Sequence, residues 1–374
     1  MSDDIPEPDR IEGAPHPRET PVLFGQSAAE ASFLEAFNAG RLHSGWLITG
    51  PRGVGKATLA WKIATFLLSQ EPDQGDRLFG APPPPETLHV DEDHPDARLV
   101  QSGAHPRLFI VRRPYDEKTK KLKADITVDA VRGVKGFFHM SATDGGRRVV
   151  IVDAADELNR NAANAILKEL EEPPADTTIL LIAHQPSRLL PTIRSRCREL
   201  RCGPLGADDL SQALTQAGHT ADATEALTVL AGGSAGDAIA MLNHDGLPRY
   251  AEIIKVMDNL PNADRPAALS LANSCAGVAN VIRYGLTLDL IDHFLARCAR
   301  AGLLGPPATQ GAPGEARLLA RLSPDDRAAR AWAQLQQDLT ARIRHGRAVN
   351  LDPAALVLDI VFKIEETARA VAAR

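Results

Sequence analysis

Short apolar runs alternate with amphipathic stretches along the first two hundred residues. Four runs rich in β-branched and other apolar residues predict buried strands, at residues 45–50, 107–111, 147–153 and 177–183. The stretches between them carry apolar residues at helical spacing, as Phe33, Leu34 and Phe37 do within residues 27–42. Strands that alternate with helices predict an α/β fold, in which a parallel sheet has helices on both faces.

Beyond residue 203 the strand pattern disappears, and every periodic stretch is helical. Residues 206–242 contain three short amphipathic stretches and predict a small helical lid domain. The rest of the chain reads as helices, with one Gly/Pro-rich break at residues 301–319. The pattern therefore predicts four regions: a tail (1–21), an α/β domain (22–203), the lid (204–246) and an all-α C-terminal domain (247–374).

Two segments lack the periodicity of their surroundings. Residues 1–21 are acidic and rich in proline, and they lack the apolar stretch of a signal peptide, so we expect a disordered tail. About residues 71–106 interrupt the α/β pattern with a run of prolines and a polar stretch. We interpret this second segment as an insertion into the domain.

The composition is that of a globular protein with two or three domains in its 374 residues. A net charge of −6 argues against a protein that grips DNA mainly by bulk electrostatics. No stretch approaches the roughly 20 apolar residues that span a bilayer. The four cysteines are widely spaced, which predicts reduced thiols in a cytoplasmic protein and no disulfide framework.

The sequence GPRGVGKA, residues 50–57, follows one predicted strand and opens a helix. A phosphate-binding P-loop needs this context: its glycines let backbone N–H groups curl around phosphates, and Lys56 reaches the β and γ oxygens. A glycine-rich turn that binds nothing is the alternative. Because the lysine and the flanking elements agree, we favour a nucleotide pocket.

Two positions depart from an active P-loop ATPase. A Ser or Thr hydroxyl should follow the lysine and bind Mg²⁺, but this residue is Ala57, and Thr58 comes one position too late. Asp153 ends its strand as the acid that holds Mg²⁺, yet Ala154 follows it where a carboxylate would orient the attacking water. These positions predict weak metal binding and poor hydrolysis.

Other charged residues near these motifs have two interpretations each. Asp156 and Glu157 follow the alanine pair, and we expect them to cap or charge the start of the next helix rather than to act in catalysis. Arg196 lies in a connection between a helix and a strand, in TIRSRCREL. It forms either an ordinary surface ion pair or an arginine finger, which is offered to the γ-phosphate of a neighbouring subunit.

Three segments together resemble the clamp-loader branch of the AAA+ ATPases: GPRGVGKATLA, NAANAILKELEEPP and LLPTIRSRC. The resemblance covers residues 22–245 through these motifs. It implies an AAA+ P-loop domain and places an oligomerising collar at residues 247–374. It also implies that Asp153 is the Walker B acid, that Arg196 is the finger in trans, and that ATP is cradled by Gly50, Gly53, Gly55 and Lys56.

The resemblance leaves some positions open or missing. Sensor 1 of the family falls on His184 or Gln185, and the sequence does not choose between them. The sensor 2 arginine falls on Gly236 and is absent. Many clamp-loader subunits carry a four-cysteine zinc module after the P-loop helix, whereas residues 69–106 contain no cysteine. We therefore expect no zinc, and we expect solvated loop residues at His89, Asp91, Asp93, His94 and His105.

Within this resemblance, losses at the hydrolysis positions, with the arginine for a neighbour retained, imply a stator-like clamp-loader subunit. By resemblance its partners are gamma/tau and delta subunits and, through the complex, the sliding clamp and primer–template DNA. ATP or ADP binding stays possible, with weakly held Mg²⁺. The alternatives are an active gamma/tau-type ATPase and a non-replicative P-loop NTPase. Residues 107–148 hold eleven Lys or Arg against five acids, which we interpret mainly as a solvated loop.

Overall fold

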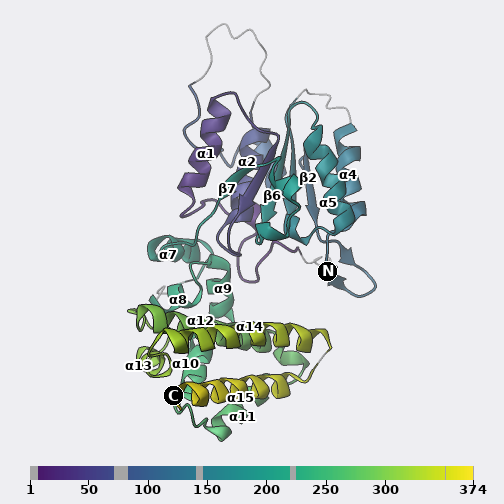
Figure 1. The fold of residues 1–374 in the computed structure, drawn as a ribbon. Helices are drawn as coiled ribbons and strands as arrows, with labels where there is room; N and C mark the ends of the chain where they lie inside the picture. Colours follow the sequence, from purple (N-terminus) through teal and green to yellow (C-terminus); the bar gives the residue numbers. More distant parts are fainter. Residues whose placement is uncertain (1–6, 71–82, 140–145, 220–224, 350, 374) are drawn as a thin grey trace. The chain divides into compact units, whose positions relative to one another are not determined.

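The computed structural model describes residues 7–70, 83–139, 146–219, 225–349 and 351–373 (Figure 1). The chain divides into two compact units. The first takes in the chain up to His219 together with Ser234–Gly236, and the second takes in the remainder. The α/β pattern of the sequence falls in the first unit, and the second unit is helical.

A parallel sheet of five strands forms the centre of the first unit. The strands are β1 (Gly45–Thr49), β2 (Leu108–Arg112), β5 (Arg148–Asp153), β6 (Thr177–Ala183) and β7 (Arg198–Arg201), in the spatial order β2-β5-β6-β1-β7. Because β1 lies between β6 and β7, the loop after it leaves the sheet beside the carboxyl end of β6. In open parallel sheets, ligands bind at the carboxyl ends of the strands.

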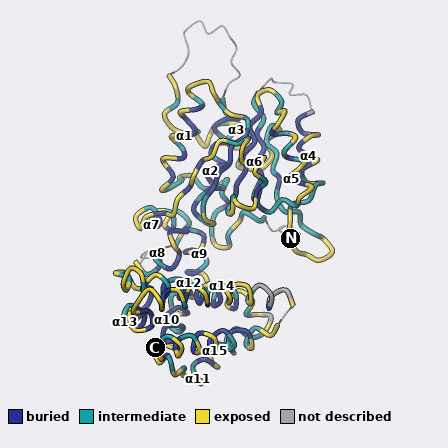
Figure 2. Tube along the Cα trace, viewed as in Figure 1, coloured by how far each residue is buried: buried dark blue, intermediate teal, exposed yellow. Residues whose placement is uncertain are grey.

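Helices cover both faces of the sheet, so the α/β prediction is confirmed. On one face, α1 (Ser27–Asn38), α2 (Lys56–Leu68) and α3 (Pro95–Gln101) contribute to a core with Trp46, Ile48 and Leu180. On the other face, α4 (Val128–His139) and α5 (Arg160–Glu171) pack on Leu47 and Val150. Figure 2 shows the buried strands between these partly exposed helices. Alternate residues of a strand thus enter separate cores, which explains the uninterrupted apolar runs.

The remaining elements of the first unit are short apart from one helix of the predicted lid. They are η1 (Pro17–Glu19), the antiparallel pair β3 (Tyr115–Asp116) and β4 (Lys121–Leu122), η2 (Ala155–Glu157), η3 (Pro186–Arg188), α6 (Pro191–Arg194) and α7 (Ala207–Gln216).

Two segments differ from the expectations drawn from the sequence. Residues 7–21, expected as part of a disordered tail, have a defined course in which the fully buried ring of His16 contacts Trp61 of α2. The insertion at residues 71–106 contains α3, and His94 caps this helix by accepting a hydrogen bond from the backbone N–H of Asp96. Composition favours disorder only where side chains find no partners; His16 is buried against Trp61, and His94 caps a helix. Residues 1–6 and 71–82 lie outside the described residues.

The second unit confirms the helical C-terminal region. Its elements are α8 (Glu225–Leu230), α9 (Ala235–Asn243, of which the first two residues belong to the first unit), α10 (Gly246–Met257), α11 (Arg265–Asn273), η4 (Val278–Asn280), α12 (Val281–Leu304), α13 (Glu315–Leu322), α14 (Asp326–Ala348) and α15 (Pro353–Ala372). The predicted lid does not form a unit of its own, because α7 belongs to the first unit and α8 to the second. Within the described residues, no helix is both long and apolar enough to cross a membrane.

A buried carboxylate organises the Gly/Pro-rich break of the second unit. Glu315 begins α13 and is fully buried. It accepts hydrogen bonds from the Tyr250 hydroxyl at 2.6 Å, the Arg297 guanidinium at 2.5 Å and the backbone N–H of Gly311 at 2.5 Å. This network joins the break to α10 and α12, since a buried charge needs such partners.

Candidate nucleotide pocket and exposed arginine

The loop between β1 and α2 has the backbone shape that a P-loop requires. Gly50, Gly53 and Gly55 all have positive φ, at 145°, 70° and 98°. A Cβ atom at Gly50 would lie 2.1 Å from the carbonyl oxygen of Cys202, so only glycine fits there. The sequence motif thus forms the expected curl at the carboxyl ends of the strands.

Lys56 lies beneath this loop and is almost fully buried. Its ammonium group donates hydrogen bonds to the carbonyl oxygens of Gly50, at 2.8 Å, and of Pro51. Burial lowers its pKa to about 8, although Cys202 and nearby carboxylates favour the charged form. The lysine is positioned to meet a phosphate, and its charge is already engaged by the loop that would cradle one.

Asp153 ends β5 beside Arg112, which is its register partner on β2. Burial, with the nearby carboxylates of Asp9 and Glu157, raises the pKa of Asp153 to about 7, although Lys56 opposes this shift. The acid expected to hold Mg²⁺ is therefore protonated in about half of the molecules at neutral pH. The carboxylates around Asp153 outweigh the nearby cation Lys56 in their effect on its pKa.

Asp156 and Glu157 lie in the first turn of η2, so they place charge at the start of the next helix as expected, but neither side chain caps it. Asp156 instead accepts hydrogen bonds from the backbone N–H groups of His184, at 3.0 Å, and Gln185, at 3.1 Å. The helix α5 is capped by Asn159, which accepts from the N–H of Ala162. The short helix η2 intervenes between the acids and α5, and it turns Asp156 towards the end of β6.

Glu157 forms ion pairs with two arginines. Its carboxylate lies 2.9 Å from the guanidinium of Arg52, in the P-loop, and 2.8 Å from that of Arg113. Neither Glu157 nor Asp156 is therefore free to orient a water molecule for attack on a phosphate.

His184, one of the two sensor 1 candidates, has a ring whose pKa is affected by the charged residues of the P-loop. Burial, together with the charges of Lys56 and Arg52, lowers its pKa to about 4. Its Nδ1 atom is buried and has no hydrogen-bond partner among the described residues. Gln185 makes its hydrogen bonds through its backbone: its N–H donates to Asp156, and its carbonyl oxygen accepts from the N–H of Arg188. These observations favour His184, although its role remains a prediction.

Gly236, the position that the resemblance assigns to the missing sensor 2 arginine, lies in close contact with the P-loop. Its N–H donates to the carbonyl oxygen of Gly53 at 3.1 Å. A Cβ atom here would lie 3.0 Å from the Cα of Gly53 and 2.7 Å from the Cδ1 of Ile11. The absence of the arginine thus goes with a close backbone contact against the P-loop.

The residues around the pocket fit a phosphate group better than a magnesium ion. Ala57 offers no hydroxyl, and Thr58 is buried within α2. Among the described residues, no group of three or more His, Cys, Asp or Glu side chains could hold a metal. Asp153 would be the only Walker-type ligand, so bound Mg²⁺ would depend largely on the phosphates themselves.

Two histidines of the insertion, His94 and His105, have structural partners. His105 is buried rather than solvated, contrary to expectation; its Nε2 lies 3.0 Å from an Asp96 oxygen, and its Nδ1 accepts from the Arg107 N–H. Burial lowers the pKa of His105 below its usual value. The ring is held between a helix N-terminus and the start of β2.

Arg196 lies in the turn between α6 and β7, and its side chain is 38% exposed. One guanidinium nitrogen is 2.9 Å from the Glu171 carboxylate, and another donates to the Thr192 carbonyl at 3.0 Å. The ordinary surface ion pair considered above is therefore present. An exposed pair of this kind contributes only about 0–1 kcal/mol, so the guanidinium can exchange Glu171 for another anion at little cost.

The basic segment at residues 107–148 includes a preformed hairpin. The Asp116 carboxylate accepts hydrogen bonds from the backbone N–H groups of Lys118 and Thr119 and so orders the tip. Its lysine side chains are exposed, at Lys118, Lys120, Lys121 and Lys123. The hairpin is thus a compact, locally positive surface on a protein whose net charge is negative.

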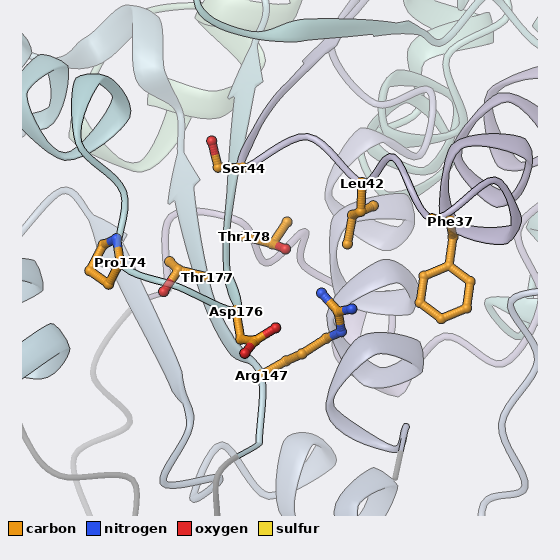
Figure 3. Close-up of a pocket in the computed structure, with 9 residues that line it drawn as sticks. Phe37, Leu42, Ser44, Arg147, Pro174, Asp176, Thr177 and Thr178 are labelled. Carbon is orange, nitrogen blue, oxygen red and sulfur yellow. The ribbon is translucent and has the colours of Figure 1, made fainter. Parts of the chain in front are cut away.

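A cavity of about 310 Å³ lies at the opposite end of the strands, where β6 begins (Figure 3). Phe37 and Leu42 line one side, and the guanidinium of Arg147 extends towards them, 5.9 Å from the centre of the Phe37 ring. None of the site residues expected from the sequence lines it. The sequence carried no signal for this cavity, since its residues come from separate segments.

Comparison with known proteins gives one consistent result. Residues 25–205 match the protein family described as "DNA polymerase III, delta subunit". DNA polymerase III subunit delta' of Pseudomonas aeruginosa is 36% identical over 259 residues, which cover 65% of this chain and 73% of that protein. The subunit of the same name from Escherichia coli is 33% identical over 243 residues, which cover 64% and 66%.

More distant likenesses lie among gamma subunits. DNA polymerase III subunit gamma of Buchnera aphidicola is 27% identical over 235 residues, which cover 61% of this chain and 58% of that protein. A solved structure of a gamma subunit-related protein from Thermotoga maritima has a TM-score of 0.41 at 15% identity, covering 90% of this chain and 100% of that one.

Proposed function

The chain belongs to the DNA polymerase III delta' family, and from this premise we propose that it is a stator-like clamp-loader subunit. In this role it completes the active site of a neighbouring gamma/tau-type ATPase with Arg196, while its own pocket hydrolyses ATP poorly or not at all. The complex, which also contains a delta subunit, loads the sliding clamp at primer–template junctions in the cytoplasm.

The accessibility of Arg196 is the observation that carries the proposal. The arginine is held by one surface ion pair, whereas Lys56 of the same domain is buried and engaged by its own loop. A guanidinium supplied in trans can neutralise charge that develops on a transferring phosphoryl group. Nothing in that role requires the delta'-type pocket to turn over.

An active gamma/tau-type ATPase is the second candidate, favoured by the P-loop backbone and Lys56. It would need a carboxylate placed to orient water, and Ala154 supplies none. Asp156 is engaged by two backbone N–H groups and Glu157 by two arginines. These contacts support the stator role over the enzymatic one.

The test is the steady-state ATPase rate of the reconstituted clamp loader with Arg196→Ala. Loss of a trans arginine costs about 10³-fold or more in kcat at the site it serves, so the complex should lose the share of turnover that belongs to that site. Arg194→Ala is the matched control, because Arg194 is an exposed arginine on the same turn. Equal rates for the two variants would show that Arg196 is not a finger.

A companion variant separates the two candidates. Lys56→Ala removes the P-loop lysine of this subunit alone, and under the stator proposal it should change the complex's ATPase rate less than twofold. A loss as large as that of Arg196→Ala would indicate that this subunit hydrolyses ATP itself.

A further inference from the structure

The first described segment of the chain, residues 7–20, is held by a buried polar cluster, and we call it the N-terminal strap. His16 is fully buried, and its Nδ1 accepts a hydrogen bond from the backbone N–H of Arg18 at 3.1 Å. Its Nε2 lies 3.1 Å from a carboxylate oxygen of Asp9 and 3.5 Å from one of Glu7. These contacts fold the strap back on itself and fix it against α2.

Arg112 ties the same acids to the edge of the sheet. Its guanidinium lies 2.9 Å from Glu7 and 3.5 Å from Asp9. Since Arg112 is paired in register with Asp153, these contacts bring Asp9 to the carboxyl ends of β2 and β5. The Asp9 side chain is only 4% exposed, and its Oδ1 atom has no hydrogen-bond partner among the described residues.

The middle of the strap reaches the P-loop through Gly236. The Cδ1 of Ile11 lies 2.7 Å from where a Gly236 Cβ would be, and the Gly236 N–H donates to the carbonyl oxygen of Gly53. Further along, the carbonyl oxygen of Gly13 lies 3.1 Å from the Nε2 of His219. The strap therefore runs from the Walker B end of the pocket to its glycine loop, with contacts along its length.

We propose that the N-terminal strap acts as an intramolecular gate on the nucleotide pocket, with the carboxylate of Asp9 placed beside Asp153 where a nucleotide would bring its phosphates. A nucleoside triphosphate must displace the strap before it binds, so its apparent affinity is reduced by the fraction of molecules whose strap is in place. This gate goes beyond the proposed function, because it concerns access of nucleotide to the pocket and does not depend on Arg196.

The experiment measures the binding of a fluorescent ATP analogue to the full chain, with and without Mg²⁺. Asp9→Asn keeps the shape of the side chain and removes its charge, and it should tighten binding roughly tenfold under both conditions. His16→Ala removes the anchor and should act in the same direction, and deletion of residues 2–16 is the second variant should His16→Ala lower the melting temperature. Glu12→Gln is the control, because Glu12 is an exposed carboxylate on the same segment.

Three outcomes would overturn the gate. Unchanged affinity, or no binding, in Asp9→Asn and in the deletion would show that the strap does not limit nucleotide access. A gain that survives Lys56→Ala would place the new binding outside the P-loop. A loss of affinity in Asp9→Asn only with Mg²⁺ would make Asp9 a metal ligand.

A second readout follows the strap directly. Hydrogen exchange of residues 7–20 should become faster when the analogue is added, because the strap is lifted from its contacts. Unchanged protection with nucleotide bound would contradict the gate. The result is independent of the finger: a loader ATPase unaffected by Arg196→Ala would remove the stator role and leave the gate standing.

Discussion

Charged side chains at two places on one domain are held in opposite ways. In the nucleotide pocket, Lys56 donates to its own loop, and Glu157 bridges two arginines. At the turn before β7, Arg196 has a single carboxylate partner, and both side chains of that pair are about 40% exposed. The charges of the pocket are satisfied internally, whereas the arginine is available to another molecule.

The difference shows that a charged side chain on the surface of a fold can be free to meet another molecule while the charges of a buried pocket are not. Removing the partner of a buried charge costs several kcal/mol of stability. The charged groups of the pocket therefore cannot readily exchange their present partners for a ligand. An exposed pair costs about 0–1 kcal/mol to open. A surface arginine can therefore serve a neighbouring active site whatever becomes of the pocket in its own domain.

Asp153→Asn should show most clearly that the pocket stores unfavourable charge. Asp153 has its pKa raised from 3.8 to about 7, so the folded state binds the proton more tightly than the unfolded chain. The Asp153 carboxyl therefore lowers the free energy of unfolding progressively as the pH rises from 3.8 to 7, and this unfavourable contribution is complete above that range. The variant should gain about 2–4 kcal/mol at pH 8 and nothing near pH 4, measured by urea unfolding at both values.

Asp129→Asn is the matched control for this experiment, because the Asp129 side chain is 79% exposed on α4. It should change the free energy of unfolding little at either pH. A gain for Asp153→Asn that was the same at pH 4 and pH 8 would mean that charge is not its cause.

Gly236→Arg tests whether the pocket can be restored by replacing a missing residue. The new side chain would meet the Gly53 backbone and Ile11, so we expect a loss of about 1–3 kcal/mol in the free energy of unfolding and no gain of ATPase activity. Gly136→Arg is the control, because a Cβ atom at Gly136 on α4 meets nothing within 4 Å. Thermal unfolding of both variants, with an ATPase assay, decides between steric loss and recovered function.

The same comparison separates what the sequence could predict from what it could not. The P-loop and four strands were predictable because glycine spacing and apolar runs are local properties of the chain, whereas β7, with the sequence RELR, contains no apolar run. The partners of Asp156 were not, since His184 lies 28 residues away along the chain. The buried position of His16 was missed for the same reason: acidic, proline-rich composition predicts disorder unless distant groups such as Trp61 and Arg112 supply contacts.

Glu171→Gln should change the free energy of unfolding least, and it tests the exposed ion pair between Arg196 and Glu171. The substitution removes the charge that faces Arg196 and keeps the side-chain shape, so the free energy of unfolding should change by less than about 0.5 kcal/mol. The reconstituted loader should keep its ATPase rate, because the guanidinium needs no help from Glu171 to meet a phosphate. A loss as large as that of Arg196→Ala, with unfolding unchanged, would instead make Glu171 a positioning residue that holds the finger in place, and the arginine would then be prearranged rather than merely available.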